Sequence, residues 1–421
     1  VHPCEKIRWT LGGDGTKVSR ISNFVIFCIS PIDIPDAGQK TVAVVKTSEK
    51  YENLKNACKP LFDEINELIK AGSISVSQSR TVKSECFLTG DMKFLLSVLG
   101  LKSATADQCC IYCLINKSDR TKFERSQNYY ESSKLKRTIE SIEKDSKKCV
   151  HGVLHPPLIF IDLDHVVPDL LHLTLRLTDV LEKNIFLQAK QTDVRSKIAR
   201  TAPTSVVNKA KELFRKCGVS FDLWETKEDG KVDNLTWTSL SGNEKKKVLS
   251  NLPNLLRTSD IFNAEDRDKI SSIWESLSDL LKQFKEPPVV DPHTTLFDMA
   301  QKWISTFLSY RQVGYQKCTP YMHSLQYHFP YFVKLYGSLS KFSCQGIEKN
   351  NDIIKKIHHR KSQRWDACKE ALIVKKRIEI SKQEKVHRST RPYLKRNKQY
   401  WEEEIRETRG TKRAKLCESN D

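Results

Sequence analysis

The sequence predicts a mixed α/β domain that is interrupted by a large, mainly helical region. Two observations predict this class. Short runs rich in Val, Ile, Phe and Thr fill the N-terminal quarter of the chain, and helical periodicity dominates from about residue 160 onwards. The 421 residues are 38% hydrophobic and 9% aromatic, which is enough for a large folded core. No apolar run reaches about 18 residues, so we expect no membrane-spanning helix and no membrane partner.

Four strand-like runs open the chain: Ile7–Leu11, Ile21–Ile29, Thr41–Val45 and Val82–Leu88. Glycine-rich residues 11–16 read as a turn after the first run. A helix is predicted over Leu54–Ala71, because apolar residues recur there at helical spacing and Gly72 follows. Another helix follows Asp91. The order strand, strand, strand, helix, strand, helix predicts an RNase H-like core, since other α/β folds more often alternate strands and helices from the start.

Helical periodicity then predicts a helical insertion and a basic final element. The predicted helices are Ser196–Cys217, Asn243–Leu256, Ala264–Phe284, Leu296–Tyr310 and Met322–Leu339, followed by Gly346 to Arg377. We therefore divide the chain into four parts. These are 1–105 (first part of the RNase H-like core), 106–340 (helical insertion with a zinc site), 341–377 (last core helix) and 378–421 (basic C-terminal helix and tail).

Carboxylates stand where an RNase H-like nuclease needs them. Such an enzyme holds two divalent ions with acids from the first strand, the end of the fourth strand and a late helix. Asp14 ends the first run and Asp91 ends the fourth. Carboxylate ligands suit Mg²⁺ or Mn²⁺. Each aspartate also has a structural alternative: Asp14 as a turn residue, and Asp91 as an N-cap of the helix that follows it.

A C-x-x-C pair, Cys110 and Cys113, offers two thiolates to one zinc ion, which needs two more ligands. His323 and His328 are the nearest suitable pair in type. The alternative is two buried thiols, and neighbouring Cys109 leaves the choice of thiols open. The thirteen cysteines are odd in number and irregularly spaced, which indicates a reducing compartment rather than a disulfide scaffold.

A third motif, IFIDLDHVV at 159–167, resembles the D-x-D nucleophile motif of haloacid-dehalogenase-like phosphatases through Asp162 and Asp164. That fold needs alternating strands and helices downstream, whereas the downstream chain reads as helical. We keep this phosphatase as a remote alternative.

Basic charge is concentrated towards the C-terminus. The formal charge is +19, and residues 341–415 carry 23 Lys and Arg against 10 Asp and Glu. A polyanionic partner is expected, because neutralised phosphates release counterions; the alternative is a solvated basic helix face. The segment RGTKRAKL at 409–416 reads as a nuclear address. The chain starts at Val1 without Met or an apolar leader, so we expect part of the protein to precede it.

Five motifs, taken in order, resemble the catalytic core of the V(D)J recombination-activating recombinase and the related Transib transposases. They are GGDGTKV at 12–18, CKPLFDEI at 58–65, FLTGDMKFL at 87–95, the C-x-x-C pair, and the long segment 321–352 that contains H-x4-H and IEKNND. IDLDH at 161–165 has a looser counterpart inside the family's helical insertion. The family has an acidic residue where this chain has Gln345, and a longer first half.

The resemblance implies site residues. Asp14, Asp91 and Glu348 match the catalytic carboxylates, which hold two Mg²⁺ or Mn²⁺ ions. Cys110, Cys113, His323 and His328 match the ligands of one structural Zn²⁺. On the final helix, beyond Glu348, basic side chains are placed to reach DNA: Lys349, Lys355, Lys356, Arg360 and Lys361.

The resemblance also implies an activity. It is a DNA transposase or recombinase of the DDE type, an endonuclease that nicks DNA and then joins the freed 3′-hydroxyl to a second phosphodiester. It further implies a homodimer, a possible accessory subunit, a nuclear location and no small-molecule substrate. The alternative function is a domesticated DNA-binding or scaffold protein that keeps the fold but not cleavage.

Overall fold

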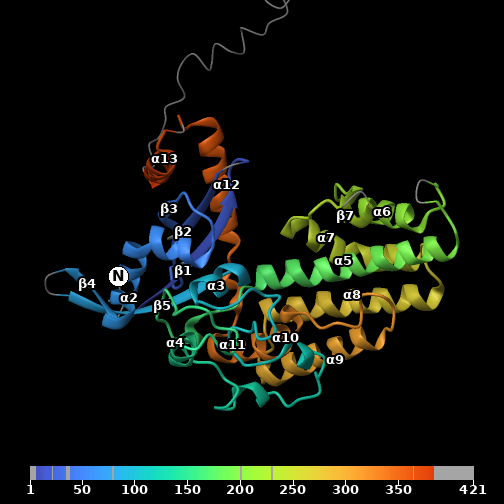
Figure 1. Cartoon of the computed structure of the whole chain (residues 1–421), viewed down its shortest axis with the longest axis horizontal. Coiled ribbons are helices and arrows are strands. Elements are labelled where there is room, and N and C mark those ends of the chain that lie inside the picture. Colours follow the sequence, from blue (N-terminus) through green and yellow to red (C-terminus); the bar gives the residue numbers. More distant parts are fainter. Residues whose placement is uncertain are drawn as a thin grey trace, which may run out of the picture.

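The computed structural model describes residues 6–20, 22–34, 38–77, 80–199, 202–228, 231–363 and 365–383. Figure 1 shows two parts, a sheet with helices against it and a long helical arm that extends to one side. The predicted nuclear address and almost all of the predicted part 378–421 lie outside the described residues. Within the described residues no helix is both long and apolar enough to cross a membrane, and every cysteine is a free thiol.

The sheet is mixed and has five strands in the order β3-β2-β1-β5-β4. Their bounds are β1 Lys6–Lys17, β2 Asn23–Pro31, β3 Lys40–Val45, β4 Ser73–Ser77 and β5 Arg80–Gly90. Strand β1 lies antiparallel to β2 and parallel to β5. The mixed α/β class is thus confirmed, and each predicted strand run overlaps a strand. Strand β4 was not predicted, because its SISVS sequence is short and serine-rich.

The glycine-rich segment 11–16 is not a turn but the continuation of β1, so this expectation was wrong. The glycines serve close packing. A Cβ on Gly12 would lie 2.1 Å from Ile347 Cδ1, and one on Gly13 would lie 2.2 Å from Phe94 Cζ. Both distances are far below van der Waals contact. Glycine is therefore needed here because helices press on both faces of β1.

Alternate residues of β2 show how the sheet is covered. Val25 and Phe27 face α1 (Tyr51–Ala57), α2 (Lys59–Ala71) and α3 (Met92–Val98). Phe24 and Ile26 face the opposite side, where α12 (Gln345–Arg360) and α13 (Ala367–Gln383) pack. The predicted helix 54–71 is broken at Cys58, because Pro60 starts a new helix.

The segment from Leu101 to Val166 belongs to the core on the α1–α3 side, where Ile111, Ile142 and Val153 are buried. It includes α4 (Ile139–Ser146). Its end runs beside β5: Val166 bridges Leu88 in parallel, and Val167 N donates to Leu88 O at 2.9 Å. The chain then turns directly into the helical arm.

The arm is a helical bundle with its own core around Trp274 and Trp303. Its helices are α5 (Leu170–Arg195), α6 (Val206–Lys216), α7 (Gly242–Arg257), α8 (Ala264–Lys285), α9 (Pro292–Ser309), α10 (Pro320–Tyr327) and α11 (Phe329–Tyr336). A hairpin of β6 (Leu223–Glu228) and β7 (Lys231–Trp237) interrupts them. The predicted helix 196–217 begins only at Val206, since Ser205 caps it.

Candidate functional site

The first two predicted carboxylates lie side by side. Strands β1 and β5 run parallel and pair Gly13 with Gly90, so Asp14 and Asp91 are the next residues along two adjacent strands. The Asp91 side chain also accepts a hydrogen bond from Phe94 N at 2.7 Å and thereby caps α3. The N-cap alternative for Asp91 is therefore correct, and it is compatible with a second role because one carboxylate oxygen remains.

Helix α12 brings Glu348 to the same place. Its first turn packs Ile347 onto Gly12, and one turn later Asn351 donates a hydrogen bond to Asp14 Oδ2. The chain enters α12 along β5, where Thr89 Oγ1 donates to Phe342 O at 3.0 Å. Gly12 and Thr89 thus dock α12 and the residues before it against the strand ends.

The acids are close enough to change each other's protonation. Burial raises the pKa of Asp14 to about 7. The negative charges of Glu49, Asp91 and Glu348 act in the same direction, and His172 opposes them. The pKa of Glu348 is also raised, by burial above all. This partly buried group of carboxylates has more negative charge than the neighbouring cations neutralise. A bound divalent ion would stabilise the ionised carboxylates.

Glu49 was not among the predicted site residues. Its side chain is only 5% exposed and its Oε1 accepts a hydrogen bond from Gly15 N at 2.6 Å, while Oε2 binds Lys93 Nζ. Glu49 lies in the short connection between β3 and α1, a segment without periodicity or motif. Only the packing of this connection against β1 reveals it.

Asp169 and His172 were also missed. At the start of α5 the buried Asp169 accepts hydrogen bonds from His172 Nδ1 at 2.6 Å and from Cys344 N at 2.9 Å. The other ring nitrogen of His172 lies 3.6 Å from Glu348 Oε1. Burial lowers the pKa of His172, but the bond to Asp169 and the nearby negative charges outweigh it and raise the pKa overall. A D-x-x-H sequence at a helix start was the available indication.

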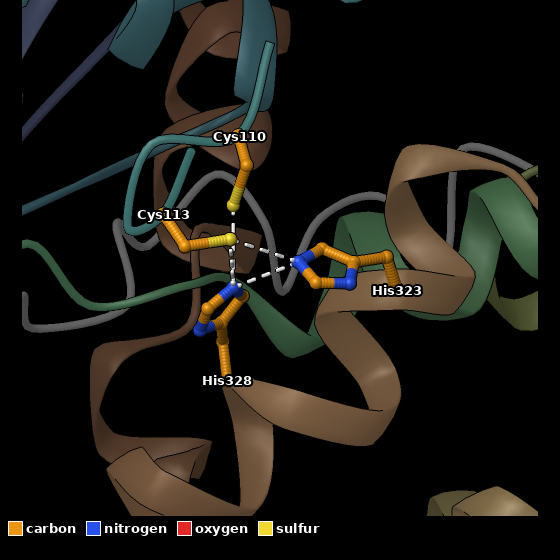
Figure 2. A group of neighbouring side chains, drawn as sticks. All are labelled: Cys110, Cys113, His323 and His328. Carbon is orange, nitrogen blue, oxygen red and sulfur yellow. Dashed lines mark hydrogen bonds between the residues drawn. The ribbon is translucent and has the colours of Figure 1, made fainter. Parts of the chain in front are cut away.

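The predicted zinc ligands converge in a second, buried site. Figure 2 shows Cys110 and Cys113 from one loop facing His323 and His328 of α10 and its end. Cys110 Sγ lies 3.2 Å from His328 Nε2, Cys113 Sγ lies 3.2 Å from His323 Nε2, and the two Nε2 atoms are 3.1 Å apart. In a tetrahedral zinc site with the usual bond lengths, the distances between neighbouring ligand atoms are about 3.4 to 3.6 Å. The distances observed here are a few tenths of an ångström shorter.

This cluster fits a zinc site. All four side chains are buried, and the donor set of two thiols and two imidazoles is one that structural zinc uses. Arg137 fixes the loop by donating to the carbonyl oxygens of Cys110 and Cys113, at 2.9 and 3.2 Å. Cys109 takes no part, because its sulfur accepts a hydrogen bond from Arg120 Nη2 at 2.9 Å.

The remaining predicted residues are placed as follows. Lys349, Lys356, Arg360 and Lys361 are exposed on or directly after α12, and Lys355 is half-buried with Asp352 at 4.0 Å. Asp162 accepts a hydrogen bond from Asp164 N at 2.9 Å, and Asp164 pairs with Lys136 at 3.2 Å. The D-x-D motif therefore has local structural roles.

No protein-family model matches this chain, and no curated protein matches it significantly.

Proposed function

We propose that this chain is an RNase H-like DNA endonuclease of the DDE transposase or recombinase type. The observation that carries the proposal is the grouping of Asp14, Asp91 and Glu348, from two adjacent parallel strands and one late helix. The sheet order supports it: three antiparallel strands are followed by helices and a strand parallel to β1. The parallel bridge at Val166 supports a further short strand beside β5.

The three carboxylates would hold two Mg²⁺ or Mn²⁺ ions. The fit rests on oxygen ligands that are partly buried and on the raised pKa of Asp14. When bound, such ions activate the attacking hydroxyl and stabilise the leaving oxygen of a phosphodiester.

The surrounding residues would organise this chemistry. Asn351 holds Asp14 in place. Asp169 fixes the ring of His172 through Nδ1, so that Nε2 faces Glu348 and can hold or move a proton beside the reacting phosphate. Lys93 stands over the acids with a side chain that is 70% exposed, and Lys349 lies exposed next to Glu348. We propose that both bind DNA phosphates.

The zinc site would have a structural role. It ties the loop at 110–113, which follows α3, to α10 in the helical arm. The arm and the sheet are thereby held in register near the carboxylates. By resemblance, we further propose that the protein acts in the nucleus as a homodimer on DNA, with a nick followed by strand transfer.

A nicking assay tests the proposal. Supercoiled duplex DNA is incubated with wild type or Asp91→Asn, with Mg²⁺ or Mn²⁺. The matched control is Asp162→Asn, which makes the same change at a carboxylate outside the site. We expect wild type and the control to nick, and Asp91→Asn to lose activity by about 10²- to 10³-fold, as for loss of a group acting in the transition state. Equal nicking by wild type and Asp91→Asn would refute the proposal.

The same assay addresses the alternative of a domesticated protein. Gln345 stands where the family has an acid, which favours this alternative. Tight DNA binding without nicking in either metal would establish it, and activity on small phosphomonoesters that depends on Asp162 would instead indicate a phosphatase.

A further inference from the structure

We propose that α5 and the loop after α9 form a basic track that binds the duplex DNA flanking the cleavage site. The inference rests on the proposed function, because DNA is the partner to which it refers. The track starts at His172, beside Glu348, and follows one face of α5 away from the carboxylates. Its residues on α5 are His172, Arg176, Val180, Lys183, Leu187, Gln191 and Arg195, spaced by three or four residues.

The first basic residue joins the track to the candidate active site. Arg176 is exposed. It lies close enough to Glu348 and to Tyr321 of α10 for its positive charge to oppose the rise in pKa that burial causes in both groups. It also pairs with Asp179 at 3.3 Å, an exposed pair that leaves the guanidinium accessible. Arg176 therefore extends the group of cations beside the carboxylates onto α5.

Further along, the track widens into a hollow of about 660 Å³ between α5 and the loop at 311–319. Its cations are Lys183, Arg195, Arg311 and Lys317, and no acidic residue lines it. All four are exposed, and among the described residues none of them has a carboxylate within ion-pair distance. The rest of the lining includes amide side chains, Gln191, Gln312 and Gln316 among them. Unpaired cations mixed with amides are the groups that contact DNA phosphates and sugars.

The hollow is held in a fixed shape. Gly314 has a φ of +90° and packs so tightly on α5 that a Cβ there would lie 2.1 Å from Asn184 Oδ1. The next residue, Tyr315, is fully buried. The Tyr310 hydroxyl accepts a hydrogen bond from Gln188 Nε2 of α5 at 2.8 Å. The loop therefore presents Arg311 and Lys317 at set positions opposite Lys183.

The length of the track favours duplex DNA over a small anion. From His172 to Arg195 the helix rises about 35 Å, at about 1.5 Å per residue. This equals about ten base pairs of B-DNA, at about 3.4 Å each. A track that begins at the carboxylates and extends for one helical turn of DNA is suited to the flank of the phosphodiester being cleaved.

The test is a binding measurement in Ca²⁺, which separates it from cleavage. The fourfold variant Lys183→Ala, Arg195→Ala, Arg311→Ala and Lys317→Ala is compared with wild type by fluorescence anisotropy, on duplexes of about 10 and about 30 base pairs over a range of salt. The control variant carries the same charge change around α4: Lys134→Ala, Lys144→Ala, Lys147→Ala and Lys148→Ala, all exposed lysines.

We expect the track variant to lose affinity for the longer duplex, with the slope of log K against log salt reduced by about 3 to 4, or about 0.9 per lost phosphate contact. The control should bind as wild type.

Unchanged affinity and slope in the track variant would overturn the track, even if wild type nicks DNA. Loss of binding in the variant, with no nicking by wild type, would keep the track and reject the nuclease. Single-stranded RNA or an acidic protein that displaces the duplex at equal charge concentration would overturn the assignment to duplex DNA.

Discussion

At the scale of single residues, the candidate active site depends on side chains that support other side chains. Asp169 has no exposed side-chain surface. Its Oδ2 accepts hydrogen bonds from His172, and its Oδ1 accepts one from Cys344 N. One carboxylate thus orients the histidine and fixes the entry to α12. Its position explains why Glu348 and His172 meet although they are far apart in the sequence.

His172→Gln tests this positioning. Glutamine keeps a polar side chain but cannot hold a proton beside Glu348. We expect the nicking rate to fall by about 10²- to 10⁴-fold, the usual range for a proton-transfer group. In Ca²⁺ the salt dependence of DNA binding should change by no more than about one phosphate contact. Asp169→Asn should lower the rate in the same direction. A His172→Gln protein that nicks at the wild-type rate would show that the ring only fills space.

The residue scale also shows what the sequence could not reveal. Asp14, Asp91 and the four Cys and His residues of the candidate sites could be found because they stand at strand ends or at recognisable spacings. Glu49, Asp169 and His172 act through contacts with distant segments, such as Gly15 N and Cys344 N. The D-x-x-H sequence marks Asp169 and His172 only as a helix start, and no local pattern marks Glu49, so a single sequence does not reveal these contacts.

At the scale of elements, strand β1 is packed so closely between helices that Gly12 and Gly13 have no space for a side chain. Its Gly-Gly and Asp-Gly pairs are typical of turns and predict one here. The physical reason for them is instead the approach of Phe94 and Ile347 from opposite faces. The strands with alternating or continuous apolar residues were predicted well, whereas the serine-rich β4 was not.

Gly13→Ala measures this tightness. The new methyl group would meet the buried Phe94 ring at 2.2 to 2.3 Å. We expect a loss of about 1 to 3 kcal/mol in the free energy of unfolding, as for other overpacked cores. Gly346→Ala is the control, because its methyl group would meet only the end of the Gln39 side chain, at 3.1 Å. Equal stability of the two variants in urea unfolding would contradict the packing argument.

The contact of α5 with α7 contains two buried charged side chains, Lys245 and Glu182, beside the half-exposed Asp179. Lys245 Nζ binds Asp179 and lies 3.6 Å from Glu182 Oε2. Burial raises the pKa of Glu182 from 4.5 to about 7, with Lys245 opposing this shift. Because the folded state holds this proton more tightly than the unfolded state, stability falls as pH rises from about 4.5 to about 7.

Glu182→Gln should remove that pH dependence. We expect wild type to lose at most about 3 kcal/mol across this window, and the variant to lose less and to be the more stable protein at pH 8. Lys245 keeps Asp179 as its partner in the variant. Thermal unfolding from pH 5 to pH 8 provides the measurement, and parallel curves for the two proteins would reject the role of Glu182.

At the scale of the whole molecule, the buried Cys and His cluster joins the loop that contains Cys110 and Cys113 to the helical arm. Its ligands come from Cys110 and Cys113 on one side and from α10 on the other. The sequence indicated the ligands by type, and the choice of thiols became clear only from the Arg120 contact of Cys109.

Cys110→Ser tests the zinc site. We expect about one zinc per chain in wild type and none in the variant, with a large fall in the unfolding temperature, since zinc binding is coupled to folding. Cys109→Ser should keep its zinc. Metal analysis of the purified proteins decides the matter: unchanged zinc content in Cys110→Ser, or none in wild type, would be contrary to the assignment.

The late arrival of α12 has a consequence for the making of the protein. The hydrogen bond from Asn351 to Asp14 joins residues 337 positions apart, and the one from Thr89 to Phe342 spans 253. Ribosomes add about 5 to 20 residues per second, so the first aspartate waits on the order of tens of seconds for its helix to be synthesised. A nascent chain that ends before α12 therefore holds Asp14 and Asp91 but lacks Glu348, so the carboxylate group is complete only once α12 has been synthesised.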